Sequence, residues 1–362
     1  MDNKDKYIYL MNDAIKGFFL DGLKISLRNP SLAYNVFRMF KQQKKAASQR
    51  LHWEEQGIHV PPYMIISITN RCNLNCKGCY AHALHKNKGV EMSEERLRNL
   101  ISEAKGLGIS LILLAGGEPL VRSEILDIAG EFPEIVFPVF TNGLLINNEI
   151  IEKMKRFRNI IPVISLEGYE EDTDNRRGEG VYEHAKGIAE ELGKKNIFYG
   201  VSLTYTSHNC NAVTDNEFIK SLVDLKCKLF LFVEYVAVKK GTEDWIPTDE
   251  QRVLMPYIIK LFRQKFPALF TAFPGDEEKY GGCMSAGRGF VHVSPDGRVE
   301  PCPFAPYSDV SLEDLSLKDA LQSDFLKTIR QNHHQLTETR GGCVLWEKRD
   351  WVQSLLVKRT KQ

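Results

Sequence analysis

Residues 72–80 read Cys-Asn-Leu-Asn-Cys-Lys-Gly-Cys-Tyr, and they follow an apolar run at residues 63–69, Tyr-Met-Ile-Ile-Ser-Ile-Thr. The apolar run predicts a β-strand, so Cys72, Cys76 and Cys79 lie in the loop that leaves its carboxyl end. The three thiols are four and three residues apart, so a single turn of the loop can direct all of them to one point. Thiolates suit soft metal centres, and an iron–sulfur cube held by three Cys leaves its fourth iron free. The stretch therefore predicts an iron–sulfur site with an open position.

A structural zinc site is the alternative for this loop. Cys76, Cys79, His82 and His85 have the short spacings and the mixed composition that zinc binds. A second pair of ligands far along the chain, which such knuckles usually have, is absent from the sequence. Simple packing of the thiols is disfavoured, because polar residues separate them.

The whole chain has 362 residues and is 43% hydrophobic, enough for one large domain or for a barrel with an appendage. No run of about 18 uncharged apolar residues and no signal peptide is found, so we expect a cytoplasmic protein. Eight Cys, three of them in one loop, fit a reducing compartment and metal binding better than a disulfide framework.

The first fifty residues form a basic arm. They hold ten Lys and Arg against four Asp, a net charge of +6, whereas the whole chain carries +1. From Pro30 onwards, apolar and basic residues alternate with helical spacing, which predicts an amphipathic helix. Its expected apolar face is Ala33, Val36, Phe37 and Phe40, and its expected basic face is Arg38, Lys41, Lys44 and Lys45.

Two interpretations of this arm are open. A second helix is expected before the first, in the apolar cluster at residues 18–27, and the pair could pack on the outside of a barrel with its lysines in solvent. Alternatively, residues 30–50 contact a partner or an anionic membrane surface, for which basic amphipathic helices are suited. The sequence has no nucleic-acid-binding module, so no nucleic acid is expected.

Residues 60–270 repeat a pattern of strand, polar loop and helix. The expected strands are residues 64–69, 110–115, 135–140, 160–166, 198–204 and 229–236. Six alternating units imply a parallel sheet with right-handed crossovers. We therefore predict an α/β protein with a partial (β/α)6 TIM barrel at residues 60–270, an N-terminal helical arm at 1–59 and a small C-terminal α+β region at 271–362.

Further polar motifs follow the next strands, at the edge where the chemistry of such barrels collects. They are Gly116-Gly117-Glu118-Pro119 after the second strand, Thr141-Asn142-Gly143 after the third, and Ser165-Leu166-Glu167-Gly168 with Arg176-Arg177 after the fourth. Alone, each could be an ordinary turn. The glycines of the first motif would let the backbone approach a ligand closely.

The C-x3-C-x2-C spacing, the aromatic Tyr80 and the Gly-Gly-Glu-Pro motif together resemble the radical S-adenosylmethionine (SAM) enzymes, over about residues 60–240. The resemblance implies a [4Fe-4S] cluster on Cys72, Cys76 and Cys79, with SAM bound at the open iron. It further implies a SAM pocket, in which Glu118 receives the amino group. The residues that it assigns to this pocket are Tyr80, Gly116, Gly117, Glu118, Asn142, Ser165 and Arg177.

In the fourth motif, one residue departs from the family pattern and the arginine pair has two possible roles. Glu167 stands where the family usually has Asp, so its role is not carried over. In the family reading Ser165 contacts the ribose and Arg177 the carboxylate of SAM. The alternative is that Arg176 and Arg177 are a solvated pair that neutralises the acidic residues 170–172.

The C-terminal region carries three more cysteines. Asp296-Gly297 between two short β runs predicts a hairpin, which would bring Cys283 and Cys302 towards one end. A helix is expected at residues 316–330, and Cys343 follows. This arrangement resembles the SPASM extension or its shorter twitch form, with fewer Cys than a full SPASM. The resemblance implies one auxiliary iron–sulfur cluster on Cys283, Cys302 and Cys343, its fourth ligand open or supplied by His333 or His334. The alternative is a hairpin that binds nothing.

The function that the resemblance implies is C–H activation. In the family, reductive cleavage of SAM gives methionine and a 5′-deoxyadenosyl radical, which removes a hydrogen atom from an unactivated carbon. An electron donor such as flavodoxin or ferredoxin is implied. By analogy with SPASM-type enzymes we expect a peptide or protein substrate. The rival is a membrane lipid or isoprenoid, suggested by the basic arm, with the enzyme at the inner face of the membrane. A non-catalytic iron–sulfur or zinc protein, used for binding or electron transfer, is the third hypothesis.

Overall fold

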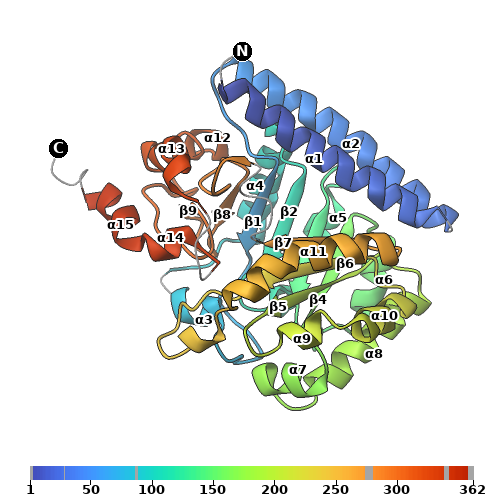
Figure 1. Cartoon of the computed structure of the whole chain (residues 1–362). Helices are drawn as coiled ribbons and strands as arrows, with labels where there is room; N and C mark the ends of the chain where they lie inside the picture. The colour runs from blue at the N-terminus through green and yellow to red at the C-terminus, as the bar shows by residue number, and fades with distance from the viewer. Residues whose placement is uncertain (1–2, 28, 86–88, 274–279, 338–341, 358–362) are drawn as a thin grey trace.

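The computed structural model describes residues 3–27, 29–85, 89–273, 280–337 and 342–357. They contain one nine-stranded sheet, in the order β7-β6-β5-β4-β3-β2-β1-β8-β9 (Figure 1). The strands are β1 (Tyr63–Ser67), β2 (Leu111–Ala115), β3 (Phe137–Thr141), β4 (Ile160–Leu166), β5 (Gly200–Tyr205), β6 (Leu229–Glu234), β7 (Leu269–Phe273), β8 (Phe290–Val293) and β9 (Val299–Glu300). The first eight are parallel, and the sheet is open, so the predicted partial barrel is confirmed.

All six predicted strands are present, but the sheet is wider than predicted. Strand β7 pairs with β6 and was missed, because Pro267 precedes it and only five residues form it. The expected boundary at residue 270 falls inside this strand. Strand β8 of the C-terminal hairpin pairs in parallel with β1. The hairpin therefore continues the barrel sheet beside the strand that leads into the cysteine loop.

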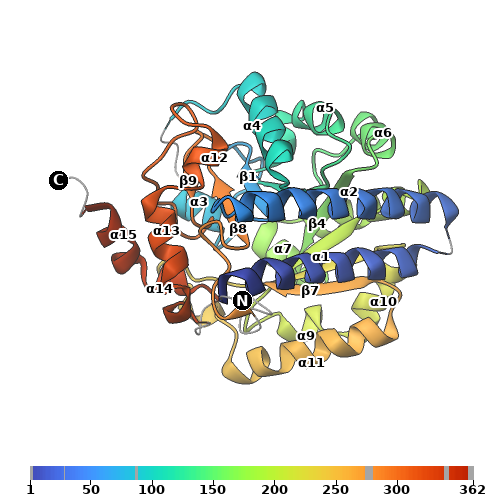
Figure 2. The same ribbon diagram turned by 90° about the horizontal axis from the view of Figure 1, so that it is seen from above.

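Helices between the strands cover the outer face of the sheet (Figure 2). They are α4 (Glu94–Leu107), α5 (Ile125–Gly130), α6 (Asn148–Arg156), α8 (Val181–Lys194), α10 (Asn216–Asp224) and α11 (Asp249–Lys265), whereas the short helices α3 (Tyr80–Leu84), α7 (Glu170–Arg177) and α9 (Cys210–Val213) lie in the loops that follow β1, β4 and β5. Alternate strand residues meet them: Met64 and Ile66 on β1, and Ile112 and Leu114 on β2, have no accessible surface. The main core lies between this outer face and the helices.

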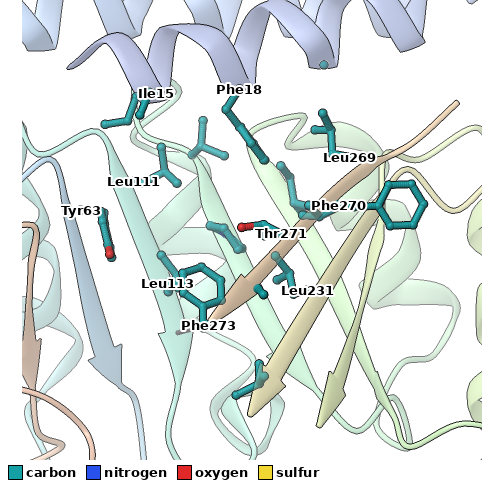
Figure 3. Close-up of a pocket in the computed structure, with 18 of the residues that line it drawn as sticks. Ile15, Phe18, Tyr63, Leu111, Leu113, Leu231, Leu269, Phe270, Thr271 and Phe273 are labelled. Carbon is teal, nitrogen blue, oxygen red and sulfur yellow. The ribbon is translucent and has the colours of Figure 1, made fainter. Parts of the chain in front are cut away.

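The basic arm consists of α1 (Asn3–Ser26) and α2 (Pro30–Glu55), which lie side by side. They pack on the barrel with Lys41, Lys44 and Lys45 exposed, as the first interpretation expects, but at an end of the barrel and not on its side. They lie across the ends where the strands begin (Figures 1 and 3), and Phe19 and Met39 join an apolar cluster with strand residues such as Val163 and Leu231. The pair therefore closes the amino-terminal end of the barrel.

The buried face of α2 also differs from the predicted one. Its buried residues are Leu32, Val36, Met39, Gln43, Ala46 and Arg50. Of the predicted apolar face only Val36 is among them, and Phe37 is 41% exposed. Polar residues can continue the buried stripe because they form hydrogen bonds with backbone groups. The Arg50 guanidinium, for example, donates to the Gly108 carbonyl oxygen at 2.5 Å.

The C-terminal region begins with the predicted hairpin, in which β8 and β9 pair antiparallel and Gly297 has a φ of 80°. The helix expected at 316–330 is two helices, α12 (Leu317–Ala320) and α13 (Asp324–Gln331), because Ser316 and Ser323 each cap a new start. The last two helices of the described residues are α14 (Val344–Glu347) and α15 (Arg349–Val357). Within the described ranges, none of the helices combines the length and the apolar character needed to cross a membrane.

Candidate active site

The loop of Cys72, Cys76 and Cys79 leaves the carboxyl end of β1 and is held by backbone and side-chain contacts. The Glu91 carboxylate accepts from the Thr69 hydroxyl at 2.7 Å and from the Asn70 N–H at 2.9 Å. At the far end of the loop, the Lys77 N–H donates to the Arg176 carbonyl oxygen at 2.8 Å. The loop is therefore fixed at both ends before any ligand binds.

Cys72, Cys76 and Cys79 are partly exposed, and their thiols are close enough for the charge of one to shift the pKa of another. Burial raises the pKa of Cys72 to about 11, and the nearby Glu118, Cys76 and Cys79 add smaller contributions in the same direction. Burial also raises the pKa of Cys76. Among the described residues, no three His, Cys, Asp or Glu side chains are as close as one metal ion requires. A cube spaces its thiolates more widely, because each Cys binds a different iron.

Gly116 and Gly117 let the next loop approach the cysteine loop. A Cβ on Gly117 would lie 2.1 Å from the Arg71 carbonyl oxygen, and one on Gly116 would lie 2.6 Å from that of Thr69. Two backbone hydrogen bonds join the loops: Gly117 N–H donates to the Thr69 carbonyl oxygen at 2.7 Å, and Glu118 N–H donates to the Arg71 carbonyl oxygen at 2.9 Å. In this structure the close approach made by the glycines is to the chain's own backbone.

Glu118 and Asn142 connect the ends of β2 and β3 to the cysteine loop. The Glu118 carboxylate is 1% exposed and accepts backbone N–H bonds from Asn142 at 2.8 Å and from Leu120 at 3.1 Å. Burial raises its pKa, and these bonds oppose the shift. The Asn142 side-chain amide donates to Asn73 Oδ1 at 2.8 Å.

The ends of β4 and α7 bring an ion-pair cluster to the same edge. Glu167, 1% exposed, lies 2.6 Å from Arg176 and 2.5 Å from Arg177. Burial lowers the pKa of Arg177. The charges of Glu167 and Cys76 raise it, and together with the hydrogen bond to Glu167 they outweigh burial, so the net shift is upward. The alternative pairing of these arginines with residues 170–172 is wrong, because the carboxylate that they reach is that of Glu167. Ser165 is partly exposed near the end of β4.

Tyr80 lies between the two sets of cysteines. Its ring packs 5.0 Å from that of Phe304, and burial raises its pKa, with smaller contributions from the charges of Cys79 and Cys302. His85, a ligand in the zinc alternative, has its Nε2 2.7 Å from the Pro303 carbonyl oxygen. The first cysteine loop therefore contacts the C-terminal hairpin directly.

Cys283 and Cys302 come together, as the hairpin predicts, and Cys343 lies beside them. They line one cavity, and the Cys302 thiol has its pKa raised, first by a hydrogen bond with Cys343 and then by burial. The charge of Cys283 contributes to the same shift. Of the two histidines suggested as a fourth ligand, His333 has its Nδ1 2.7 Å from the Arg330 carbonyl oxygen, and His334 is exposed.

One polar network beside the site was missed from the sequence. The His292 ring, fully buried on β8, lies 2.8 Å from the Ser67 hydroxyl through Nε2 and 2.8 Å from the Glu300 carboxylate through Nδ1. No local signal marks this network, because it depends on β8 pairing with β1. It ties the last residue of β1 to the hairpin that carries Cys302.

The barrel encloses a cavity of about 1060 Å³ (Figure 3). Its wall runs from α1 and α2 past the inner face of the strands to Cys283, Cys302 and Cys343. Near these cysteines the wall includes Glu234, which lies 2.9 Å from the Arg252 guanidinium and accepts a 3.1 Å hydrogen bond from the Tyr205 hydroxyl. The cavity thus has a long apolar stretch and one ion pair, Glu234 with Arg252, near its cysteine end.

Comparison with known proteins gives a consistent family. Residues 66–225 match the model of the radical SAM superfamily. Over 277 residues the chain is 26% identical to the AdoMet-dependent heme synthase of Methanosarcina barkeri, covering 68% of this chain and 78% of that protein. It is also 26% identical over 257 residues to the antilisterial bacteriocin subtilosin biosynthesis protein AlbA of Bacillus subtilis, covering 68% of this chain but only 56% of AlbA.

Solved structures share the fold. Streptococcus suis SuiB bound to S-adenosylmethionine aligns with a TM-score of 0.64 and 18% identity, over 80% of this chain and 72% of SuiB. SuiB bound to its precursor peptide SuiA aligns with the same TM-score and 17% identity, over 86% and 75% of the two chains. The matched segment carries the cysteine loop, Glu118 and the Glu167 cluster at one edge of an open parallel sheet. The chain therefore contains a radical SAM domain, at residues 66–225.

Proposed function

We propose that Cys72, Cys76 and Cys79 hold the [4Fe-4S] cluster and that the neighbouring strand ends hold SAM. The observation that carries this proposal is the attachment of Glu118 and of the α7 end to the cysteine loop: Glu118 N–H donates to Arg71 O at 2.9 Å, and Lys77 N–H donates at 2.8 Å to the carbonyl oxygen of Arg176, the neighbour of Arg177. One acidic and one basic group thus lie beside the three thiols, as binding of an amino acid moiety requires. Asn142, Ser165, Gly116, Gly117 and Tyr80 complete the proposed pocket.

The proposed reaction is C–H activation. Held by Cys72, Cys76 and Cys79, a cluster would supply the one-electron reduction of SAM, with the electron from an external donor such as flavodoxin or ferredoxin; this would give methionine and a 5′-deoxyadenosyl radical able to take a hydrogen atom from the substrate. The chain's own part is to position and shield. The short contacts from Glu91, Asn142 and Arg176 fix the loop, which reduces the freedom of the bound reactants.

Cys283, Cys302 and Cys343 are the proposed ligands of one auxiliary cluster. Their shared position at the cavity wall supports this assignment, and so does the effect of Cys343 and Cys283 on the pKa of Cys302. His333 stays a candidate for the fourth ligand, because the contact of its Nδ1 with the Arg330 carbonyl oxygen would orient the ring for binding through Nε2.

Two substrate classes remain candidates. A peptide is supported by the names of relatives such as AlbA and the sporulation killing factor maturation protein SkfB, and by the SuiB–SuiA complex. A lipid or isoprenoid is supported by the apolar cavity of this chain, and the geometry favours this second class.

The test of the proposed reaction is anaerobic loading with iron and sulfide, followed by SAM and a strong reductant. Wild type should bind about eight irons, and each triple Cys→Ala variant, at 72/76/79 or at 283/302/343, about four. 5′-Deoxyadenosine is expected from wild type and from the 283/302/343 variant only. Deoxyadenosine from the 72/76/79 variant, or zinc in place of iron in wild type, would refute the proposal.

A further inference from the structure

The inner face of the sheet is apolar and incompletely covered. On β1 and β2 the residues that point outward are fully buried, whereas those that point inward, including Tyr63, Leu111 and Leu113, are only partly buried. A protein with no ligand for this space would normally fill it with side chains, because interiors are close-packed. The barrel instead keeps an apolar lining around open volume.

The cavity is suited to a long apolar ligand. Its volume of about 1060 Å³ is slightly above the range of about 300–1,000 Å³ that is typical of small-molecule sites. Figure 3 shows Leu111, Leu113, Leu231 and Phe273 around the space, with Phe18 extending from α1 towards it. The wall begins at this helical cap and ends near the cysteines. A chain lying in it would therefore reach from the closed end of the barrel towards the proposed reaction centre.

Helix α11 forms one wall of the cavity, and its solvent-facing side also carries apolar residues. Met255 and Ile259 of α11 line the cavity. On the surface of the same helix, Val253, Leu254, Tyr257 and Leu261 are 64, 54, 65 and 61% exposed. Contiguous exposed apolar residues of this kind mark contacts with proteins or membranes.

Basic side chains accompany the exposed apolar ones. On α11, Lys260 and Lys265 are exposed beside the apolar stripe. On α2, Tyr34 is 66% exposed, next to the exposed basic group Arg38, Lys41, Lys44 and Lys45. Helices that combine apolar and basic surface bind anionic membrane interfaces. A bilayer accounts for the combination of apolar and basic surface, and a hydrocarbon chain accounts for the apolar depth of the cavity.

We propose that the barrel cavity takes the hydrocarbon chain of a membrane lipid, and that α11 and α2 dock the enzyme on an anionic bilayer from which this chain is drawn. Glu234 and Arg252 form the polar end of the site, near the auxiliary cysteines. This inference names the substrate class of the proposed reaction, and so rests on the proposed function for its chemistry. Its tests use binding alone and need neither cluster nor SAM.

Docking is tested by flotation with vesicles of phosphatidylglycerol and phosphatidylcholine. The full chain should float with them. Leu261→Glu should reduce the floated fraction at least fivefold, whereas Gln264→Glu, which adds the same charge at another exposed position of α11, should keep most of it. No flotation of wild type, or equal flotation of the two variants, would overturn the docking surface.

Occupancy of the cavity is tested with cis-parinaric acid, a fluorescent straight-chain fatty acid. Leu113→Trp, which fills the cavity, should weaken binding about tenfold or more, and Leu113→Gln, which keeps the volume but adds an amide, should also weaken it. Tyr257→Trp on the outer surface is the control and should bind like wild type. Thermal unfolding checks that each variant is folded. Unchanged binding by both Leu113 variants, or a peptide and no lipid extracted from the purified chain, would overturn the inference.

Discussion

The side-chain amide of Asn142 donates a 2.8 Å hydrogen bond to Asn73 Oδ1, which joins the end of β3 to the loop of the three cysteines. The same Asn142 accepts a 2.9 Å bond from the Leu144 N–H, and its own N–H donates to Glu118. One residue thus links three of the strand ends that form the site.

Asn142→Ala removes both side-chain bonds and should lower the free energy of unfolding by about 1–2 kcal/mol. We also expect the loaded protein to lose iron to a chelator several times faster, because the cysteine loop loses a tether. Asn147→Ala is the matched control. It removes the N-cap of α6, away from the site, at a similar cost of about 1 kcal/mol, and should leave the rate of iron loss unchanged.

Glu167→Gln should be among the most destabilising polar substitutions. It leaves Arg176 and Arg177, only 13 and 12% exposed, without the carboxylate that neutralises them. Removal of one partner from such a buried cluster costs about 3–5 kcal/mol, and the partial exposure of the arginines places the expected value at the lower end. Urea unfolding of the apo-protein measures it. Glu171→Gln, at an exposed position on α7, should change it by less than about 0.5 kcal/mol.

Glu118→Gln should weaken SAM binding. The carboxylate accepts from two backbone N–H groups, and an amide can accept with its oxygen only, so one N–H loses its partner and the negative charge is lost. We expect the dissociation constant of SAM to rise about tenfold or more, from the loss of a charged hydrogen bond of about 1.5–3 kcal/mol. Equilibrium dialysis of loaded protein measures it. Glu124→Gln, a partly exposed neighbour paired with Arg122, should bind SAM as wild type does.

Acid should destabilise the protein partly through His85. Burial and the neighbouring His292 lower the pKa of His85 in the folded chain, although Glu300 and the bond to Pro303 oppose this. The unfolded chain, with a His pKa of about 6.5, then binds more protons, so the free energy of unfolding falls as the pH drops below about 6.5. The slope from one such group is at most about 1.4 kcal/mol per pH unit.

His85→Gln should therefore flatten the pH dependence of unfolding between about pH 7 and 5, while its amide can still donate to Pro303. His184→Gln, at an exposed position of α8, is the control and should keep the wild-type slope. A slope that is the same in wild type and in the His85 variant would contradict the assignment.

The sequence predicted the barrel and the cysteine loop because both depend on local patterns. Each of the six strands is an apolar run followed by a polar loop, and Cys72, Cys76 and Cys79 lie within eight residues of one another. The Thr248–Gln251 capping box at the start of α11 is local in the same way, and it is present with both of its hydrogen bonds. Such signals do not require knowledge of the tertiary fold.

What the sequence could not predict depends on contacts between distant segments. The buried stripe of α2 is set by where the strands begin, so Gln43 and Arg50 are buried and Phe37 is not. The Glu167 cluster is set by the course of α7, and the Ser67–His292–Glu300 network by the pairing of β8 with β1. The cavity arises because α1 and α2 close one end of an apolar barrel. No single stretch of sequence encodes it.

The most direct test of the account is the transfer of deuterium to 5′-deoxyadenosine. The loaded enzyme is incubated with SAM, reductant and total lipids from bacterial cells grown in deuterated medium, and in parallel with the peptides and proteins of the same cells. The account predicts 5′-deoxyadenosine that carries one deuterium from the lipid fraction and none from the protein fraction. Unlabelled product from the lipids, with labelled product from the peptides and proteins, would contradict the assignment of a hydrocarbon chain to the barrel cavity.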